Sequence, residues 1–384
     1  MRDAAAGRLP YPVWLGRGAL AALGRVAADA APAHRYALVT DDAVGPLHAA
    51  AAEAALAALG GPPPVVVTLA AGEAHKTRDA WAQATDALLA AGCGRDTTVV
   101  ALGGGVVGDL AGFVAATFLR GVPVVQVPTT LLAMVDASVG GKTGVDTPAG
   151  KNLVGAFHPP AAVLLDPDLL ATLPTRDLAA GAAEALKHGV IASAAHFDDV
   201  AAHLPSIARG AADPAALERL VGDSVAIKAD AVAEDLTERG RRKTLNFGHT
   251  VGHAVEHASG YALRHGEAVA LGMVVESRIA ERLSVAESGT AARVRAACAA
   301  GGLPVALPAG LTPEVVLAAT RGDKKARAGQ VEYALPTRVG AMAAADGRWA
   351  MPVPDAVVLD ALAEAAAGPA AAVPSAQYAR ILGT

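Results

Sequence analysis

Two histidines lie four residues apart in the segment 243–253, which reads Lys-Thr-Leu-Asn-Phe-Gly-His-Thr-Val-Gly-His. On a helix, residues at this spacing project from one face, so His249 and His253 can reach a common divalent ion. A third ligand must come from elsewhere, and Glu184 is the best-placed candidate by local sequence. Three protein ligands and an open coordination position would make the metal catalytic rather than structural.

A glycine-rich segment indicates a second ligand, a dinucleotide. Gly103, Gly105 and Gly108 have the spacing G-x-G-x-x-G between a predicted strand and a predicted helix. Glycines there let the backbone approach a pyrophosphate, and the helix N-terminus supplies unpaired N–H groups. The acidic residue expected about 20 residues further on is missing, so Asp41 and Asp42, at the end of an earlier strand, could hold the ribose hydroxyls. The alternative is a turn that only packs, with Asp41 or Asp42 as a helix N-cap.

Four polar residues suit an anionic, polyhydroxylated ligand, namely Asp136, Lys142, Lys151 and Asn152, spread across a predicted Gly-rich loop. The sequence Gly-Gly-Lys-Thr at 140–143 resembles the end of a Walker loop. Asp136 stands where the first glycine of that loop would be, which argues against a P-loop nucleotidase. The alternative is a solvated loop without a ligand.

The candidate ligands also have interpretations without function. Glu184 and Lys187 are three residues apart and could face a ligand together, although this spacing also fits a surface ion pair. A lone histidine is more often a hydrogen-bonded polar group than a metal ligand. Three histidines, His249, His253 and His257, share one face of the predicted helix, which favours a metal site over isolated hydrogen-bonded histidines.

The length and composition argue against several classes of protein, namely nucleic-acid-binding, disulfide-rich and membrane-spanning proteins. A length of 384 residues predicts two or three domains, and a net charge of -5 argues against a nucleic-acid surface. Two cysteines, Cys93 and Cys298, cannot build a disulfide framework and fit a reducing compartment. The first ten residues lack a secretory signal, and no apolar window is long enough to span a bilayer. We expect a cytoplasmic protein.

The order of predicted elements indicates two domains. Four β-type runs, at residues 36–40, 64–69, 97–102 and 122–127, alternate with helical segments such as 76–91, which predicts an α/β domain with a parallel sheet over residues 1–174. Beyond residue 174, long Ala/Leu/Val segments carry charges at helical spacing. We therefore expect a mainly α-helical domain over residues 175–384 that binds metal and substrate, with one strand at 330–335 and a frayed end at 365–373.

Read together, these segments resemble the 3-dehydroquinate synthase family from about Tyr11 to Gly340. The most specific blocks are residues 103–112, 127–132, 136–145, 150–152, 184–187, 242–249 and 265–268. The family converts 3-deoxy-D-arabino-heptulosonate 7-phosphate to 3-dehydroquinate and phosphate, in the shikimate route to aromatic amino acids. It does so by transient NAD-dependent oxidation, phosphate elimination, re-reduction and intramolecular aldol closure.

The resemblance implies a cytoplasmic, homodimeric carbon–oxygen lyase that acts on phosphates, with NAD and a divalent metal, usually zinc or cobalt. It assigns the metal to Glu184, His249 and His265, and makes His253 a proton-handling residue near the substrate. The catalytic residues that it implies are Lys142, Lys187, Glu238, Asn246 and His253.

The substrate-binding residues implied by the resemblance are Arg120, Asp136, Lys142, Lys151, Asn152, Lys187, Lys228, Arg242, Asn246, His253 and one lysine of the pair Lys324 and Lys325. Arg120 would come from this or a neighbouring subunit. The implied cofactor-binding residues are Glu73, Lys76, Gly104, Gly105, Val106, Asp109, Thr129, Thr130, Lys142, Lys151, Leu169 and Thr172, beside the Asp41 and Asp42 already considered.

The chain departs from the common family pattern at Ala43, Asp146, Thr147, Ala180 and His188. These changes remove no metal ligand, and they leave open a sister sugar-phosphate cyclase, such as 2-deoxy-scyllo-inosose, 2-epi-5-epi-valiolone or aminodehydroquinate synthase. The intact blocks 140–145 and 150–152 argue against a sister enzyme. Another alternative is a metal- and NAD-dependent polyol dehydrogenase. Such an enzyme would release NADH, and it has less need for the lysine and arginine residues expected to bind the anionic groups of the substrate. A non-catalytic binding module would require that metal or NAD fail to bind.

Overall fold

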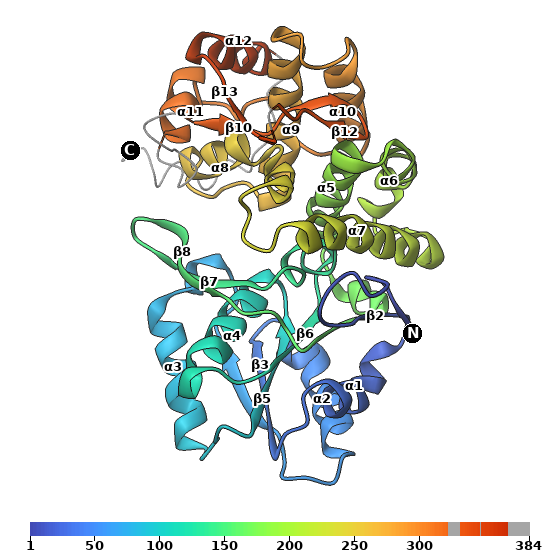
Figure 1. Cartoon of the computed structure of the whole chain (residues 1–384), viewed down its shortest axis with the longest axis vertical. Helices are drawn as coiled ribbons and strands as arrows, with labels where there is room; N and C mark the ends of the chain where they lie inside the picture. The colour runs from blue at the N-terminus through green and yellow to red at the C-terminus, as the bar shows by residue number, and fades with distance from the viewer. Residues whose placement is uncertain (322–330, 346, 368–384) are drawn as a thin grey trace. The chain divides into compact units, whose positions relative to one another are not determined.

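The computed structural model describes residues 1–321, 331–345 and 347–367 (Figure 1). The chain forms two compact units, which are described separately below. The first unit contains residues 1–174 and 214–230, and the second contains residues 175–213 and those from 231 onward. No pattern in the sequence indicates that residues 214–230 pack with the first unit. The functions expected for the two domains stay predictions.

The first unit is built on a seven-stranded sheet with the order β1-β2-β9-β6-β5-β3-β4. Only β1 runs antiparallel to its neighbour, so the prediction of a parallel sheet is confirmed. Each of the four predicted strands is present, and its observed first and last residues differ from the predicted ones by at most two positions. The strands are β1 Arg2–Asp3, β2 Val13–Leu15, β3 Arg35–Asp41, β4 Val65–Leu69, β5 Thr97–Gly103, β6 Val124–Pro128 and β9 Ala162–Leu165.

Helices cover both faces of this sheet, with α3 and α4 on one side and α1 and α2 on the other (Figure 1). Leu88 of α3 and Leu110 of α4 share an apolar core with Val39 and Val99 of the sheet. Thr77 caps α3 by accepting a hydrogen bond from the backbone N–H of Ala80, so this helix begins two residues later than predicted. The helices are α1 Leu23–Ala30, α2 Gly45–Ala57, α3 Arg78–Ala90, α4 Gly105–Thr117 and the first part of α7 Pro214–Glu234.

The predicted Gly-rich loop is an antiparallel hairpin, and the loop prediction is wrong. β7 Lys142–Thr147 pairs with β8 Gly150–Phe157. The two strands approach so closely that a Cβ on Gly155 would lie 2.1 Å from the carbonyl oxygen of Thr143. Most side chains of β8 are exposed, so the strand lacks the alternation of apolar and polar residues by which half-buried strands are recognised.

The second unit is mainly helical, as predicted, and its described residues also form two small two-stranded sheets. Its apolar core gathers side chains of α8, α9, α11 and α12, including Val255, Leu271, Val316 and Leu362. The helices are α5 Thr175–Ala192, α6 Ala194–Ile207, the end of α7, α8 His249–Ala258, α9 His265–Arg282, α10 Thr290–Ala300, α11 Pro313–Thr320 and α12 Asp355–Ala366. The strands are β10 Glu332–Tyr333, β11 Pro336–Arg338, β12 Ala341–Met342 and β13 Met351–Pro352.

The strand predicted at 330–335 is reduced to β10, and Gln330 lies outside the described residues. Most of the predicted frayed end, from residue 368, also lies outside them. Among the helices that the structure describes, none combines the length and the apolar character needed to cross a bilayer.

Glycines allow α5, α8 and α9 to approach one another closely. A Cβ on Gly266, in the first turn of α9, would lie 1.8 Å from the carbonyl oxygen of Ala180 on α5. A Cβ on Gly272, further along α9, would lie 1.9 Å from the carbonyl oxygen of Gly248, which precedes α8. Both separations are far below van der Waals contact, so only glycine fits at these positions without movement of a backbone.

We predict that Gly272→Ala destabilises the protein. Helix propensity alone would favour alanine by about 1 kcal/mol, whereas the clash with the Gly248 carbonyl should cost about 1–3 kcal/mol or more. The measurement is the free energy of unfolding in urea. Gly61→Ala is the control, because a Cβ there meets only the His34 carbonyl oxygen, at 3.8 Å. Equal stability of the two variants would contradict this account of the packing between α8 and α9.

Candidate active site

A fully buried ion pair lies on α5 in the second unit. Glu184 and Lys187, one turn apart on α5, are 0% and 1% exposed, and Lys187 Nζ lies 2.6 Å from Glu184 Oε2. Burial by itself would raise the pKa of Glu184, but the charge of Lys187 and the contact with His249 hold it well below its usual range. Glu184 and Lys187 therefore form a buried, ionised pair. The alternative interpretation of their spacing, a surface ion pair, is wrong.

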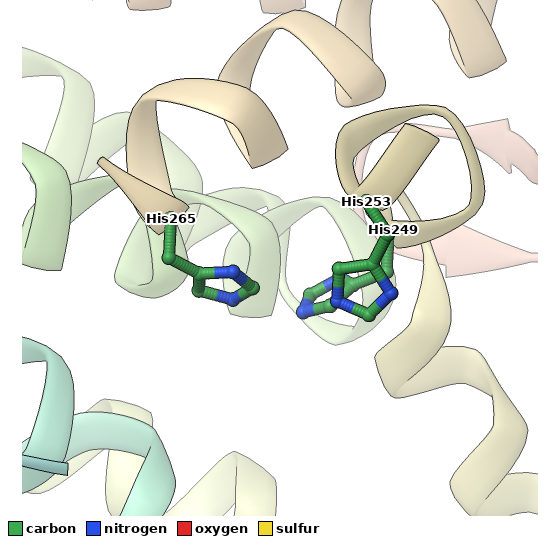
Figure 2. A group of neighbouring side chains, drawn as sticks. All are labelled: His249, His253 and His265. Carbon is green, nitrogen blue, oxygen red and sulfur yellow. The ribbon is translucent and has the colours of Figure 1, made fainter. Parts of the chain in front are cut away.

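The second oxygen of the Glu184 carboxylate faces two histidines. Glu184 Oε1 lies 3.4 Å from His249 Nε2 and 3.3 Å from His265 Nε2. His249 is the first residue of α8 and His265 the first residue of α9. The glycine contacts described above bring the start of α9 to α5 and the start of α8 to α9. Ligating atoms of His249, His253 and His265 all lie within 4.8 Å of one another. Figure 2 shows the ring of His265 turned toward the other two.

The remaining ring nitrogens of two histidines have fixed acceptors. His249 Nδ1 lies 3.1 Å from the carbonyl oxygen of Phe247, and His265 Nδ1 lies 3.3 Å from Glu256 Oε2. Because a carbonyl and a carboxylate only accept, each Nδ1 carries the hydrogen and each Nε2 is directed at Glu184. In the absence of a metal, burial lowers the pKa of His265, but its contacts with Glu184 and Glu256 outweigh this and raise it to about 10. His265 then also carries a hydrogen on Nε2, which a bound metal ion would displace.

These residues fit a divalent metal ion. With metal–ligand bonds of about 2.0–2.2 Å, tetrahedral coordination separates neighbouring ligand atoms by roughly 3.3–3.6 Å. The two distances from Glu184 Oε1 to the histidine nitrogens fall in this range. Burial and the charge of Lys187 also lower the pKa of His249, which favours the neutral imidazole that a metal binds. His257, the third histidine of the predicted helix face, is exposed and makes an edge-to-face contact with the ring of Tyr261 instead.

A second buried carboxylate holds the start of α8. Glu276 of α9 is 0% exposed and accepts hydrogen bonds from the backbone N–H of Gly248, at 2.6 Å, and of Val251, at 3.0 Å. These are groups that a helix N-terminus leaves without an intrahelical partner. Glu276 thereby fixes the backbone on both sides of His249.

The segment between α7 and α8 carries further predicted residues. Glu238 Oε1 accepts a hydrogen bond from Asn246 Nδ2 at 2.8 Å, so these two predicted catalytic residues are in contact. Arg242 is 1% exposed and donates from Nη1 to the Leu236 carbonyl oxygen at 2.9 Å. Lys324 and Lys325 lie outside the described residues.

In the first unit, the predicted cofactor residues follow the carboxyl ends of adjacent strands. Gly104 and Gly105 follow β5, Thr129 and Thr130 follow β6, and Asp41 ends β3. The chain order reverses between β5 and β3, which is where open α/β sheets bind ligands.

The glycine segment at this edge opens α4 as the sequence predicts. No side chain caps the helix start, so its N–H groups are available to an anion. A Cβ on Gly104 would lie 3.1 Å from Thr130 Cγ2, and one on Gly108 would lie 2.9 Å from Gln126 Oε1 on β6. Val106 lies half-buried in the first turn. The glycines therefore give both an open backbone and close helix–sheet packing, and these residues fit a dinucleotide phosphate.

A buried lysine draws several predicted cofactor residues together. Lys76 is 3% exposed, and its Nζ lies 3.0 Å from Glu73 Oε1, 3.3 Å from Asp109 Oδ2 and 3.6 Å from Asp146 Oδ1. Lys151 Nζ lies 3.4 Å from the same Glu73 oxygen. Burial by itself would lower the pKa of Lys76, but the carboxylates outweigh it and raise the pKa. Burial raises the pKa of Asp109 to about 6, against the opposing effect of Lys76.

Other predicted residues of the first unit are not part of this cluster. Lys228 donates from Nζ to the carbonyl oxygen of Asp136 at 2.5 Å and to its Oδ1 at 2.7 Å, at a π-helical turn. Lys142 and Arg120 are exposed. Leu169 is buried, and Thr172 Oγ1 lies 3.0 Å from His48 Nε2.

The two aspartates after β3 are used in backbone hydrogen bonds. Asp41 Oδ1 accepts from the N–H of Ala43 and of Val44, and Asp42 Oδ1 accepts from the N–H of Ala71. The bonds of Asp41 hold the turn before α2, but the N-cap of this helix is Val44, so the alternative of a helix N-cap at Asp41 or Asp42 is wrong. A contact with the ribose stays a prediction for both residues.

Three predicted site residues, two for substrate binding and one catalytic, have unusual backbone conformations. Arg120, Asn152 and Glu238 have positive φ values of 75°, 54° and 60°. Such conformations cost a non-glycine residue about 1–3 kcal/mol and are enriched at functional sites. In one case the support is visible, because Asp146 Oδ1 accepts a hydrogen bond from the N–H of Asn152 at 2.8 Å.

Sequence reasoning missed the residues that orient others. Glu256 follows His249 by seven residues on α8, and this helical spacing is the signal that could have revealed it. Glu276 and Asp146 gave no signal of their own, since their partners lie on other elements. Asp146 was noted only as a departure from the family pattern.

Comparison with known proteins identifies related families. The sequence models of the N-terminal and C-terminal parts of 3-dehydroquinate synthase match residues 66–180 and 181–326. A curated 3-dehydroquinate synthase from Symbiobacterium thermophilum is 48% identical over 332 residues, which is 86% of this chain and 92% of that protein.

Two solved structures of sugar-phosphate cyclases are similar to the chain. The 2-epi-5-epi-valiolone synthase from Streptomyces hygroscopicus subsp. jinggangensis, with NAD+ and Zn2+ bound, has a TM-score of 0.83 and 31% identity, covering 95% of this chain and 99% of that one. A 2-deoxy-scyllo-inosose synthase complexed with carbaglucose-6-phosphate, NAD+ and Co2+ has a TM-score of 0.83 and 26% identity, covering 92% of this chain and 97% of that one.

The raised pKa of Asp109 predicts a pH-dependent stability. The usual carboxyl pKa of 3.8 rises to about 6 in the folded state, so between these values the folded state binds more protons than the unfolded state. The wild type should therefore lose stability relative to Asp109→Asn as the pH rises from about 4 to 6, by up to about 3 kcal/mol. Urea unfolding of both proteins from pH 4 to 7 measures this difference, and a constant difference would refute the prediction.

Proposed function

The chain belongs to the 3-dehydroquinate synthase family, and we propose that it converts 3-deoxy-D-arabino-heptulosonate 7-phosphate to 3-dehydroquinate and phosphate. This family is one of lyases that act on phosphates. The observation that carries the proposal is the convergence of Glu184 Oε1 with the Nε2 atoms of His249 and His265, in a chain 48% identical to a curated 3-dehydroquinate synthase.

Glu184, His249 and His265 would hold a divalent metal, which supplies Lewis acidity when bound. Lys187 keeps the Glu184 carboxylate ionised through its other oxygen, so that Oε1 remains a ligand. Glu256 directs Nε2 of His265 toward the same point by accepting the hydrogen of Nδ1. Zn2+ and Co2+ are bound in the two similar cyclase structures, and we propose one of these as the metal here.

Residues at the carboxyl edge of the first-unit sheet would hold NAD, which supplies a reversible hydride acceptor when bound. The uncapped start of α4 and the backbone at Gly104 and Gly105 suit the pyrophosphate. Lys76, Glu73 and Asp109 form a cluster of fixed charges beside this segment. We assign the expected dinucleotide-binding role to the first unit and the metal-binding role to the second.

The proposed substrate contacts match an acid that also carries a phosphate. We assign the phosphate to Lys151 and Asn152, and an anionic group of the substrate to the buried guanidinium of Arg242. Asn246 orients the Glu238 carboxylate through its hydrogen bond, which suits Glu238 to accept a proton from the reacting ring. His253, whose ring lies beside those of His249 and His265, would also move protons.

Two features of the proposal rest on family resemblance alone. We propose a homodimer and a cytoplasmic location, as the resemblance implies. A sister sugar-phosphate cyclase remains the second candidate, because two such enzymes have TM-scores of 0.83 to this chain. Identities of 31% and 26% to those enzymes, against 48% to a 3-dehydroquinate synthase, rank it second.

We expect the purified protein to release phosphate from 3-deoxy-D-arabino-heptulosonate 7-phosphate in the presence of NAD+ and Zn2+ or Co2+. Since the NADH formed is consumed within each turnover, absorbance at the NADH band should not accumulate. The measurement is a phosphate assay with NADH absorbance followed in the same cuvette and 3-dehydroquinate detected as product.

Two controls separate the alternatives. Release of phosphate only from glucose 6-phosphate, whose carba analogue is bound in the 2-deoxy-scyllo-inosose synthase structure, would favour a sister cyclase. NADH that builds up with simple polyols would favour a dehydrogenase. Either result would contradict the proposed function.

A further inference from the structure

The segment that joins α7 to α8 is organised by one carboxylate that no assigned role uses. Asp235 is the first residue after α7, and its side chain is only partly buried. Asp235 Oδ1 accepts a hydrogen bond from the N–H of Arg239 at 3.0 Å, and Oδ2 accepts from the N–H of Gly240 at 2.6 Å and of Arg242 at 3.3 Å. One side chain thus binds three backbone donors within eight residues.

These bonds close a short loop, residues 236–241, between the end of α7 and the 3-10 turn at Arg241–Asn246. Within it, Glu238 has a φ of 60°, which a non-glycine residue adopts only where its surroundings enforce it. The Arg242 side chain also donates a hydrogen bond to the Leu236 carbonyl oxygen. The two ends of the loop are therefore joined both by the Asp235 carboxylate and by the Arg242 guanidinium. The loop presents Glu238, which contacts Asn246, and leads directly into Arg242.

The pKa of Asp235 agrees with a carboxylate that is held by these backbone hydrogen bonds. Partial burial raises the pKa of Asp235, but the hydrogen bonds from Arg239, Gly240 and Arg242 outweigh it and lower the pKa below its usual value. The carboxylate is therefore charged at neutral pH. It does not touch the proposed catalytic groups themselves, since it binds the backbone that carries them.

We propose that Asp235 is a positioning residue, which holds the loop 236–241 in the conformation that presents Glu238 to the substrate. This inference rests on the proposed function. It assigns to Asp235 no direct contact with substrate, metal or NAD. Without the three hydrogen bonds, the strained φ of Glu238 loses its support, and the chain before Arg242 can relax.

The variant Asp235→Asn tests this role with a side chain of the same size. An amide has one accepting oxygen, so it can keep the bond to Arg239 or those to Gly240 and Arg242, but not both sets. Asp235→Ala keeps neither. Glu234→Gln is the matched control, because it removes the same charge one residue earlier from a side chain that pairs with Arg241 Nη1 at the surface.

Two measurements are made on the metal- and NAD-loaded protein. The first is amide hydrogen exchange, in which Asp235→Asn should speed exchange at residues 236–242 while the rest of the chain and the melting temperature change little. The second is kcat/KM for 3-deoxy-D-arabino-heptulosonate 7-phosphate, which we expect to fall about 10- to 100-fold in Asp235→Asn, as is typical of a misplaced catalytic group, and further in Asp235→Ala. Glu234→Gln should stay within about twofold of the wild type on both measurements, by the small effect of exposed ion pairs.

A third comparison separates positioning from general destabilisation. If Asp235 acts through Glu238, the double variant Asp235→Asn/Glu238→Gln should be no slower than Glu238→Gln alone. Additive losses would overturn the inference, and so would unchanged exchange or full turnover in Asp235→Asn. A wild type that is inactive on this substrate would instead contradict the proposed function, and the exchange data would still decide whether Asp235 holds the loop.

Discussion

A carboxylate with no exposure to water must be surrounded by cations and hydrogen-bond donors, and the second unit is arranged to meet this requirement for Glu184. Lys187 satisfies one oxygen from the same helix, and His249 and His265 face the other from α8 and α9. Removal of one partner from a buried ion pair typically costs about 3–5 kcal/mol, because it leaves the other charge buried without compensation. The site that would hold a metal is thus also a condition for packing of the core around it.

Glycines and buried carboxylates together allow the helices to pack around Glu184. Gly266 and Gly272 allow the helices to approach, and Glu276 and Glu256 fix the backbone of His249 and the ring of His265. In the first unit the charges are reversed, because a buried lysine, Lys76, is surrounded by carboxylates at the carboxyl edge of the sheet. Each proposed ligand site is therefore preorganised by buried charges that the protein itself pairs.

The sequence predicted elements better than it predicted partners. The helix that carries His249 and His253 followed from their spacing, and the four strands followed from their β-branched runs, because these signals are local. Spacing alone pointed to His253 as a ligand, whereas the contact of His265 with Glu184 spans 81 residues and was implied only by family resemblance. The hairpin of β7 and β8 was missed because exposed side chains on β8 give no alternation. Asp235 was missed because it binds backbone atoms, which no residue pattern reveals.

The most direct test of the account is a zinc-edge anomalous diffraction experiment on crystals of the protein grown with Zn2+. We predict one strong anomalous peak within ligand distance, about 2.0–2.2 Å, of Glu184 Oε1, His249 Nε2 and His265 Nε2. A peak coordinated by His253 in place of Glu184, or no peak between α5, α8 and α9, would contradict the assignment of the buried carboxylate as a metal ligand.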